Sequence, residues 1–199
     1  MNIRKKLPLL ALAGILLLGL TAAEATTWRV DKSHSSVGFT VRHMMVSKVS
    51  GTFQKYRADV TFDPDAPASL RVHAVIDAAS IDTGNRKRDE HLRSADFFDV
   101  TRFPEITFTT TAVKPEGDRY LLTGDLAMHG VTRPVTLTLE YNGTVTDPWG
   151  NVRAGFSAAG EIDRRDWGIV WNKALDRGGL TVSNTVKLAI EVELVAKGD

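Results

Sequence analysis

The chain contains no cysteine among its 199 residues. This absence excludes a disulfide framework, a thiolate metal site and a thiol nucleophile. The stability of the protein must therefore come from the packing of its core. The length suits one domain with a substantial core.

The chain also lacks an excess of charge of either sign. Residues 26–199, which follow the leader described below, contain 22 Lys and Arg residues and 23 Asp and Glu residues, a formal charge of −1. Such a balanced composition does not indicate a basic surface for binding nucleic acid or anionic membranes. We therefore expect no nucleic-acid partner.

Signatures of two enzyme classes are missing. No G-x-S-x-G nucleophile elbow occurs, so Ser33 and His34 belong to no recognisable hydrolase motif. Asp89–Leu92 reads DEHL, which is not the H-E-x-x-H zinc signature. The histidines fall on different predicted elements at no recognised ligand spacing: His34, His43, His73, His91 and His129. We therefore predict neither catalytic residues nor a metal site.

The longest apolar run, residues 7–20, follows a basic Arg-Lys-Lys triplet at residues 4–6 and precedes small residues. This arrangement is typical of a secretory signal peptide. Ala23-Glu24-Ala25 fits the A-x-A cleavage pattern, with the cut after its last residue or, as a second choice, after its first. The run is shorter than the ~20 residues of a spanning helix, which disfavours the alternative of an uncleaved membrane anchor.

We therefore predict a signal peptide at residues 1–25, cleaved to leave a single domain at residues 26–199 with no integral membrane segment. The leader directs the chain to an oxidising compartment although it has no cysteine. Together with the simple architecture, this favours a bacterial periplasm over an animal extracellular space.

Most of the domain alternates apolar and polar residues, which indicates strands with one buried face. Turn signals separate these strands, among them Asn142-Gly143, and Gly51-Thr52-Phe53 is interpreted as a break. The pattern predicts an all-β antiparallel fold, either a barrel or a sandwich. We favour an eight-stranded barrel, because closure removes exposed strand edges. The predicted strands cover residues 35–45, 56–62, 70–77, 106–114, 120–129, 135–141, 153–162 and 186–194.

One short helix is predicted at residues 88–99, where Arg88, Leu92 and Ala95 fall at i, i+4 and i+7. We expect the segment to lie across one end of the barrel, with Leu92 and the following phenylalanines covering a cavity. Ion pairs with Asp96 and Asp99 are expected to hold it there. Arg86, Arg88 and Arg93 are the predicted cationic partners, and Asp89 belongs to the same group of charges. Residues 164–180 are predicted as an irregular end loop with one helical turn.

Several strings, in order along residues 26–199, resemble the YceI-like family of periplasmic proteins. They are TWRVDKSHSSVGFTVRHMMVSKVSGTF, SIDTGNRKRDEHLRSADFFDVTRFPEITF, GDLAMHGVTRPVTLTLE, IDRRDWGIVW and TVSNTVKLAIEVEL. The resemblance implies a lipocalin-like barrel whose apolar cavity holds a polyisoprenoid chain, an isoprenoid quinone or a fatty-acid derivative. Residues 171–179 differ from the acidic, Gly-rich form of the family, which leaves one barrel end and the exact ligand open.

The resemblance implies a non-catalytic carrier that binds an isoprenoid or acyl lipid for storage or transport, with no catalytic cofactor. Small residues at Ala154, Ala158 and Gly160 favour a cavity over a solid core, and His43 could bond a quinone-type head group. Trp167 and Trp171 are placed at a mouth. The predicted ligand-binding residues are Phe39, Val41, His43, Met45, Tyr56, Val60, Phe62, Leu92, Phe97, Phe98, Phe108, Leu122, Leu126, Met128, Leu137, Phe156, Ile162, Trp167, Trp171, Leu188 and Ile190.

Two other classes of function stay open. One is an enzyme acting on an isoprenoid or lipid, and the other is a stress or interaction module with a filled barrel. The oligomeric state is also open, with a homodimer among the states that the sequence allows.

Overall fold

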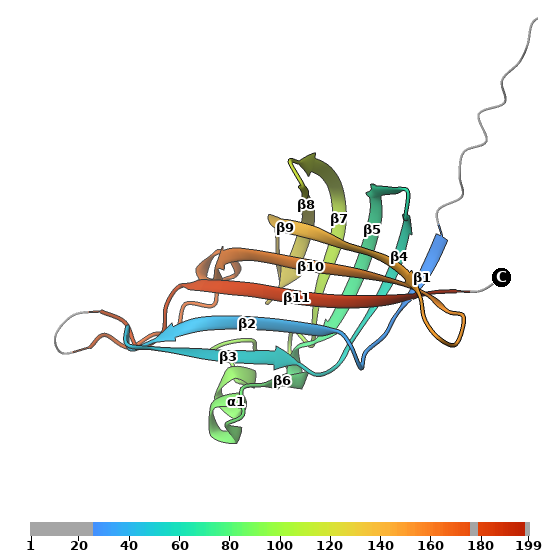
Figure 1. Ribbon diagram of the computed structural model, residues 1–199. Coiled ribbons are helices and arrows are strands. Elements are labelled where there is room, and N and C mark those ends of the chain that lie inside the picture. Colours follow the sequence, from blue (N-terminus) through green and yellow to red (C-terminus); the bar gives the residue numbers. More distant parts are fainter. Residues whose placement is uncertain (1–25, 176–178, 198–199) are drawn as a thin grey trace, which may run out of the picture.

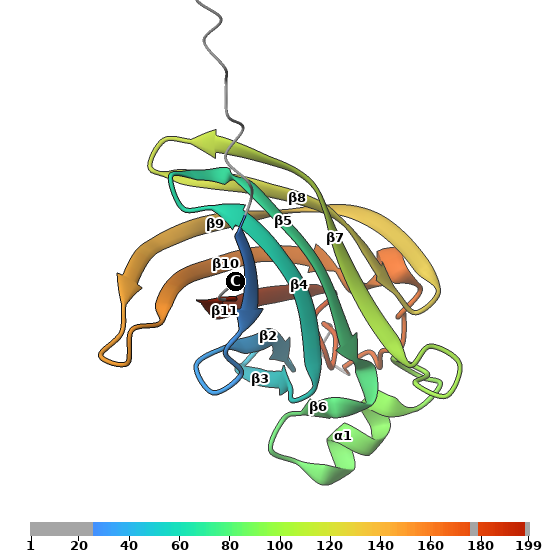
Figure 2. The ribbon, with the colours of Figure 1, turned by 90° about the vertical axis from the view of Figure 1, so that its right-hand side faces the viewer.

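Eight antiparallel strands form a closed barrel, as predicted (Figure 1). The computed structural model describes residues 26–175 and 179–197, so the predicted signal peptide lies outside the described residues. Figure 2 shows the strands curving around from β1 through β4 and back to β11. In order around the barrel they are β1 (Thr26–Val30), β4 (Tyr56–Asp63), β5 (Ala66–Asp77), β7 (Glu105–Glu116), β8 (Arg119–Met128), β9 (Val131–Thr146), β10 (Val152–Asp163) and β11 (Thr185–Ala196).

The short strand β1 closes the barrel because it pairs on both sides. Trp28 lies opposite Val60 of β4 and opposite Ala196 of β11. The sequence pattern predicts a first strand only from residue 35 and does not include β1. Only Trp28 and Val30 are apolar in this five-residue strand, and its pairing on both sides is visible only in the tertiary structure.

The first half of β11 pairs with a second set of strands that extends the sheet beyond the barrel (Figure 1). Ile190 of β11 lies opposite Val37. This extension consists of β2 (Ser36–His43), β3 (Ser47–Phe53) and β6 (Ile81–Asp82). The predicted strand at residues 35–45 is therefore part of the extension, and β1 takes its place in the barrel.

Interpreting residues 51–53 as a break was wrong, because they lie within β3. A Cβ atom at Gly51 would lie 2.6 Å from Cζ of Phe39 on the neighbouring strand. Glycine here permits close packing and does not end the strand.

The Asn142-Gly143 turn signal was also wrong, because β9 runs on to Thr146. Gly143 has a positive φ of 96°, and the pairing with β10 shifts register between Gly155 and Phe156. The glycine therefore belongs to a bulged part of the sheet. The chain reverses later, where Asp147 accepts a backbone hydrogen bond from Gly150.

The helix α1 (Arg86–Arg93) is shorter than predicted and begins earlier. The side chain of Asn85 caps its first turn by accepting from the backbone N–H of Arg88 at 3.1 Å. After the helix the backbone folds into turns, and Asp99 has a positive φ of 46°. Two short 3₁₀ helices accompany it, η1 (Ala78–Ser80) and η2 (Arg164–Trp167). The second is the predicted helical turn of residues 164–180.

Buried apolar residues form two clusters. One is built around Trp28 and Phe62, and the other around Phe97 and Trp167. None of the helices in the described residues is long and apolar enough to cross a membrane.

Candidate ligand-binding cavity

A cavity of about 550 Å³ lies inside the barrel and is lined by residues from both core clusters. Its walls are mainly aliphatic and aromatic side chains. Such walls favour an apolar ligand, since each Å² of apolar surface removed from water contributes ~25 cal/mol. The volume falls within the ~300–1,000 Å³ range of small-molecule sites.

The strand alternation places most of the predicted residues in the wall of this cavity. Whether they contact a ligand stays a prediction. Those that line the cavity are Phe39, Val41, His43, Tyr56, Val60, Leu92, Phe97, Phe98, Phe108, Leu122, Leu126, Met128, Leu137, Phe156, Ile162, Trp171, Leu188 and Ile190.

Three predicted residues are not part of the cavity wall. Met45 lies in the turn after β2 with a positive φ of 63°, so the alternation of the strand no longer applies and its side chain is exposed. Phe62 is fully buried against Trp28. Trp167 is also buried, and its indole Nε1 donates to the carbonyl oxygen of Leu126 at 3.0 Å.

Of the small residues expected to leave room, only Ala158 lines the cavity. Ala154 is buried in the core cluster around Trp28. A Cβ atom at Gly160 would lie 2.6 Å from Cδ2 of Leu137, so this glycine accommodates a neighbouring side chain.

Several lining residues were not predicted. Val37, Val72 and Ile76 share the apolar parity of predicted strands, and the same rule applied to every position would have found them. Val49 belongs to the unrecognised strand β3, and Arg164 comes from η2. No alternation marks these last two positions.

One end of the barrel is filled by aromatic side chains. The rings of Trp28 and Phe62 stack with centroids 4.7 Å apart, and Nε1 of Trp28 donates to the carbonyl oxygen of Phe62 at 3.2 Å. Phe156 packs edge-on against Phe62 at 5.0 Å. These contacts close this end of the cavity.

Apart from these aromatic side chains, the cavity wall includes His43, Lys87, His91, Thr181 and Val182, and we call this part of the wall the mouth. The exposed side chain of Lys87 brings the cavity wall to the protein surface.

Aromatic side chains pack together beside the mouth. Phe97 packs against Trp171 with ring centroids 5.1 Å apart, and Phe98 packs edge-on against Phe53 of β3 at 5.8 Å. The segment after α1 therefore covers part of the cavity, as its sequence predicts.

The charged residues of this segment do not form the predicted ion pairs. Asp96 accepts from His91 at 2.8 Å, and Asp99 pairs with Arg102 at 3.3 Å. The helix ends before these aspartates, so the spacing assumed for a longer helix does not apply.

Hydrogen bonds join the helix to the segment that precedes it, residues 79–83. The buried carboxylate of Asp89 accepts from the backbone N–H of Thr83 at 3.0 Å. Arg93 donates to the carbonyl oxygens of Ala79 and Ile81, both at 2.7 Å. Hydrogen bonds to backbone carbonyls therefore replace the predicted ion pairs.

The cavity wall contains four basic residues, Arg57, Lys87, Arg88 and Arg164. None of the described lining residues is Asp or Glu. Arg164 is only 5% exposed. Its guanidinium donates to the carbonyl oxygens of Ile169 at 2.7 Å and Ser183 at 3.1 Å. Burial lowers the pKa of Arg164 and raises that of Tyr56, another lining residue.

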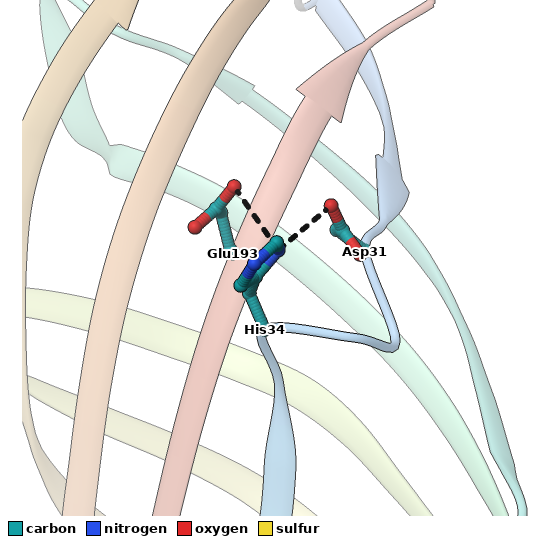
Figure 3. Close-up of side chains that lie close together, drawn as sticks. All are labelled: Asp31, His34 and Glu193. Atoms are coloured by element: carbon teal, nitrogen blue, oxygen red, sulfur yellow. Dashed lines mark hydrogen bonds and ion pairs between the residues drawn. The ribbon is translucent and has the colours of Figure 1, made fainter.

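A polar cluster lies away from the cavity wall, where Asp31, His34 and Glu193 converge (Figure 3). Their ligand atoms lie within 4.8 Å of one another. Arg153 donates to the carboxylate of Asp31 at 2.9 Å and also pairs with Glu193. The guanidinium of Arg153 supplies the positive charge that a bound metal ion would otherwise supply. The arrangement therefore suits an ion-pair network.

Ser33 completes a Ser-His-Asp group on the surface, but its geometry differs from that of a catalytic triad. Both Ser33 Oγ and Asp31 Oδ2 contact the same nitrogen of His34, Nδ1, at 3.3 and 3.2 Å. The hydroxyl of Ser33 also donates directly to Asp31 at 2.5 Å. In a triad the serine and the aspartate bond opposite nitrogens of the histidine. The group therefore shapes the turn before β2.

Known proteins share this sequence and this fold. The family model of the YceI-like domain matches residues 28–194. Protein YceI of Shigella flexneri is 42% identical over 188 residues, which cover 89% of this chain and 95% of that protein. Among solved structures, Burkholderia cenocepacia BcnA has a TM-score of 0.72 at 25% identity, covering 82% of this chain and 98% of its own.

The same fold occurs in a more distant protein. A polyisoprenoid binding domain from Saccharophagus degradans has a TM-score of 0.63 at 16% identity and covers 87% of this chain and all of its own. The sequence match over the whole barrel decides the family, and the structural likeness agrees with it. The chain belongs to the YceI-like family.

Proposed function

We propose that this protein binds one long isoprenoid chain, as an isoprenoid quinone or a polyprenyl lipid, inside the barrel for storage or transport. The observation that carries the proposal is the apolar cavity of about 550 Å³ inside the barrel. Aromatic side chains close one end of it, and the exposed Lys87 lies in its wall at the mouth. A chain with few polar groups gains from burial along its whole length. The fold shared with a polyisoprenoid binding domain supports the same ligand class.

We also propose that the protein acts in the periplasm after cleavage of residues 1–25. The support is the basic triplet, the apolar run and the A-x-A pattern of this leader. A long isoprenoid is scarcely soluble in water, so an enclosed carrier would let it cross an aqueous compartment between two membranes.

An enzyme acting on the same lipid is less well supported. Acid–base catalysis would need a positioned acid or base beside the bound chain. Among the described lining residues, the ionisable groups other than arginine and lysine are His43, His91 and Tyr56. Tyr56 donates its hydroxyl to the carbonyl oxygen of Ser35 at 2.8 Å, which gives it a structural contact.

The proposal is tested by extracting the purified exported protein, residues 26–199, with organic solvent and analysing the extract by mass spectrometry. The expected result is a long-chain isoprenoid in near-stoichiometric amount. A lipid-free extract, together with no uptake of added isoprenoid quinone, would show that the proposed function is wrong. Amino-terminal sequencing of the exported protein would test the cleavage after Ala25.

A further inference from the structure

The turn between β2 and β3 presents three consecutive apolar side chains to solvent. Met44 is 45% exposed, Met45 57% and Val46 83%. Both methionines have positive φ angles, 49° and 63°, so the tight turn directs these side chains away from the sheet. We call residues 44–46 the apolar tip.

Basic side chains flank the apolar tip on the outer face of the sheet. Arg42 lies directly opposite Lys48 in the pairing of β2 with β3. Like charges in such a pair repel each other. Within the described residues, neither side chain forms an ion pair with a carboxylate.

These two residues share a shallow surface cavity of about 330 Å³ with Lys187 and several hydroxyl groups. Lys187 pairs with Glu161 at 2.8 Å, whereas Arg42 and Lys48 keep their charge available. The hydroxyl groups in this cavity come from Thr40, Ser183 and Thr185. Ser183 already donates its hydroxyl to the carbonyl oxygen of Thr185 at 2.7 Å. The cations Arg42 and Lys48 therefore provide the charge-assisted hydrogen bonds that a phosphate group accepts.

The apolar tip adjoins the mouth of the lipid cavity. The backbone N–H of Met44 donates to the carbonyl oxygen of Thr181 at 2.8 Å, and His43 forms a β-bridge with Val182. His43, Thr181 and Val182 all line the mouth. In Figure 1 the turn after β2 lies at the far left, beside the loop that leads into β11.

We propose that this surface docks onto an anionic lipid bilayer. The apolar tip enters the acyl region, Arg42 and Lys48 bind lipid phosphate groups, and the mouth then faces the membrane. The inference rests on the proposed function, because it gives a lipid carrier a place to load and release its ligand. The formal charge of −1 of residues 26–199 conceals this local basic surface.

The opposite end of the molecule offers a contrast. Trp149 in the β9–β10 turn is 81% exposed, and Val145 is exposed nearby. That turn is organised by the acidic Asp147, which accepts from the backbone N–H of Trp149 at 2.9 Å. Figure 1 places this turn at the far right, away from the apolar tip. Exposed apolar side chains without flanking cations should not bind an anionic bilayer.

The test measures co-sedimentation of the exported protein, residues 26–199, with vesicles of phosphatidylcholine alone or mixed with phosphatidylglycerol. We expect binding to the mixed vesicles only. The double variant R42Q/K48Q should bind roughly twenty-five-fold more weakly, since each cation near an anionic surface contributes about fivefold. M44S/M45S/V46S should also lose binding, whereas the control W149S should bind like the unmodified protein.

Equal binding of R42Q/K48Q, or loss of binding in W149S, would overturn the docking surface, provided that circular dichroism shows folded protein. Inorganic phosphate at millimolar concentration should not displace the protein, because the apolar tip requires a bilayer. Full displacement by phosphate would assign a free-anion site instead. Mass spectrometry of co-purified lipid separates the two proposals. Retained lipid without vesicle binding rejects docking alone. Vesicle binding by a protein that has no lipid and takes up no added isoprenoid quinone rejects the carrier function alone.

Discussion

Trp171 packs edge-on against His91, with ring centroids 4.8 Å apart and ring planes at 89°. His91 belongs to α1, whereas Trp171 lies in the loop before β11. Phe97 contacts both rings. Two segments distant in the sequence are thus joined beside the mouth, where their contact would resist the escape of a chain bound as proposed.

Replacing Trp171 by alanine is expected to speed ligand release. An aromatic pair contributes about 0.5–1.5 kcal/mol beyond its buried area, so the release rate of a fluorescent isoprenoid analogue should rise about tenfold. W149A provides the matched control, because Trp149 lies at the opposite end and lines no part of the cavity. Equal release rates in both variants would mean that the aromatic contact does not retain the ligand.

Filling the cavity should exclude the ligand without unfolding the barrel. Ala158 lines the cavity, whereas the next residue, Ala159, is exposed on the outer face of β10. A158F is expected to reduce co-purified lipid several-fold, because the ring occupies space that the chain needs, and A159F should leave it unchanged. Mass spectrometry of the extracts makes the comparison. Normal lipid content in A158F would contradict this assignment of the binding site.

Removing the buried guanidinium of Arg164 should destabilise the fold. Arg164→Met leaves the carbonyl oxygens of Ile169 and Ser183 without their donor, and each unsatisfied buried group costs about 1–3 kcal/mol. We expect urea denaturation to give a free energy of unfolding lower by about 2–6 kcal/mol. Arg165→Met is the control, since Arg165 is exposed and pairs with Asp163 at the surface. Similar losses in both variants would contradict a special role of the buried side chain.

The Arg153 network should make stability depend on acid pH. Hydrogen bonds from Ser33 and Arg153 hold the pKa of Asp31 well below its usual range. Burial opposes the shift at Asp147, but hydrogen bonds from Asn151 and Arg153 lower its pKa as well. Because the folded-state pKa values lie below the unfolded value of about 3.9, the stabilisation is complete above that pH. It is lost as the pH falls from there through the folded-state values.

Thermal melts between pH 7 and pH 2 would check this dependence. Arg153→Gln is expected to lower the Tm at neutral pH and to flatten its decline in acid. Arg119→Gln removes a long surface pair with Glu140, 3.9 Å apart, and should leave the profile unchanged. An unchanged acid profile in Arg153→Gln would show that the network does not couple stability to pH.

The differences between the predicted and the observed elements have a common cause. Gly51 and Gly143 predict breaks by residue type, yet one accommodates the ring of Phe39 and the other lies in a bulged part of the sheet. A glycine in a strand permits either the close approach of a neighbouring side chain or a positive φ. The sequence does not tell these two roles apart, because the difference depends on the neighbouring strand. The predicted helix begins too late for a related reason, because the Asn85 cap and the turns after Arg93 are local features that periodicity does not include.

The amino-acid sequence alone determined the alternation of the strands, and with it most of the cavity wall. Side chains of one parity must share a face, so the alternation by itself assigns Phe39, Val41 and their counterparts on other strands to the interior. The same sequence resembles the YceI-like family along its whole barrel.

Only the tertiary structure decided how the barrel is closed and where it opens. Closure depends on the pairing of β1 with both β4 and β11, and the mouth on the contact between His91 and Trp171. The position of the apolar tip beside that mouth depends on the bridge between His43 and Val182. These contacts join residues far apart in the chain, and the periodicity of one segment contains no information about the segment that it meets.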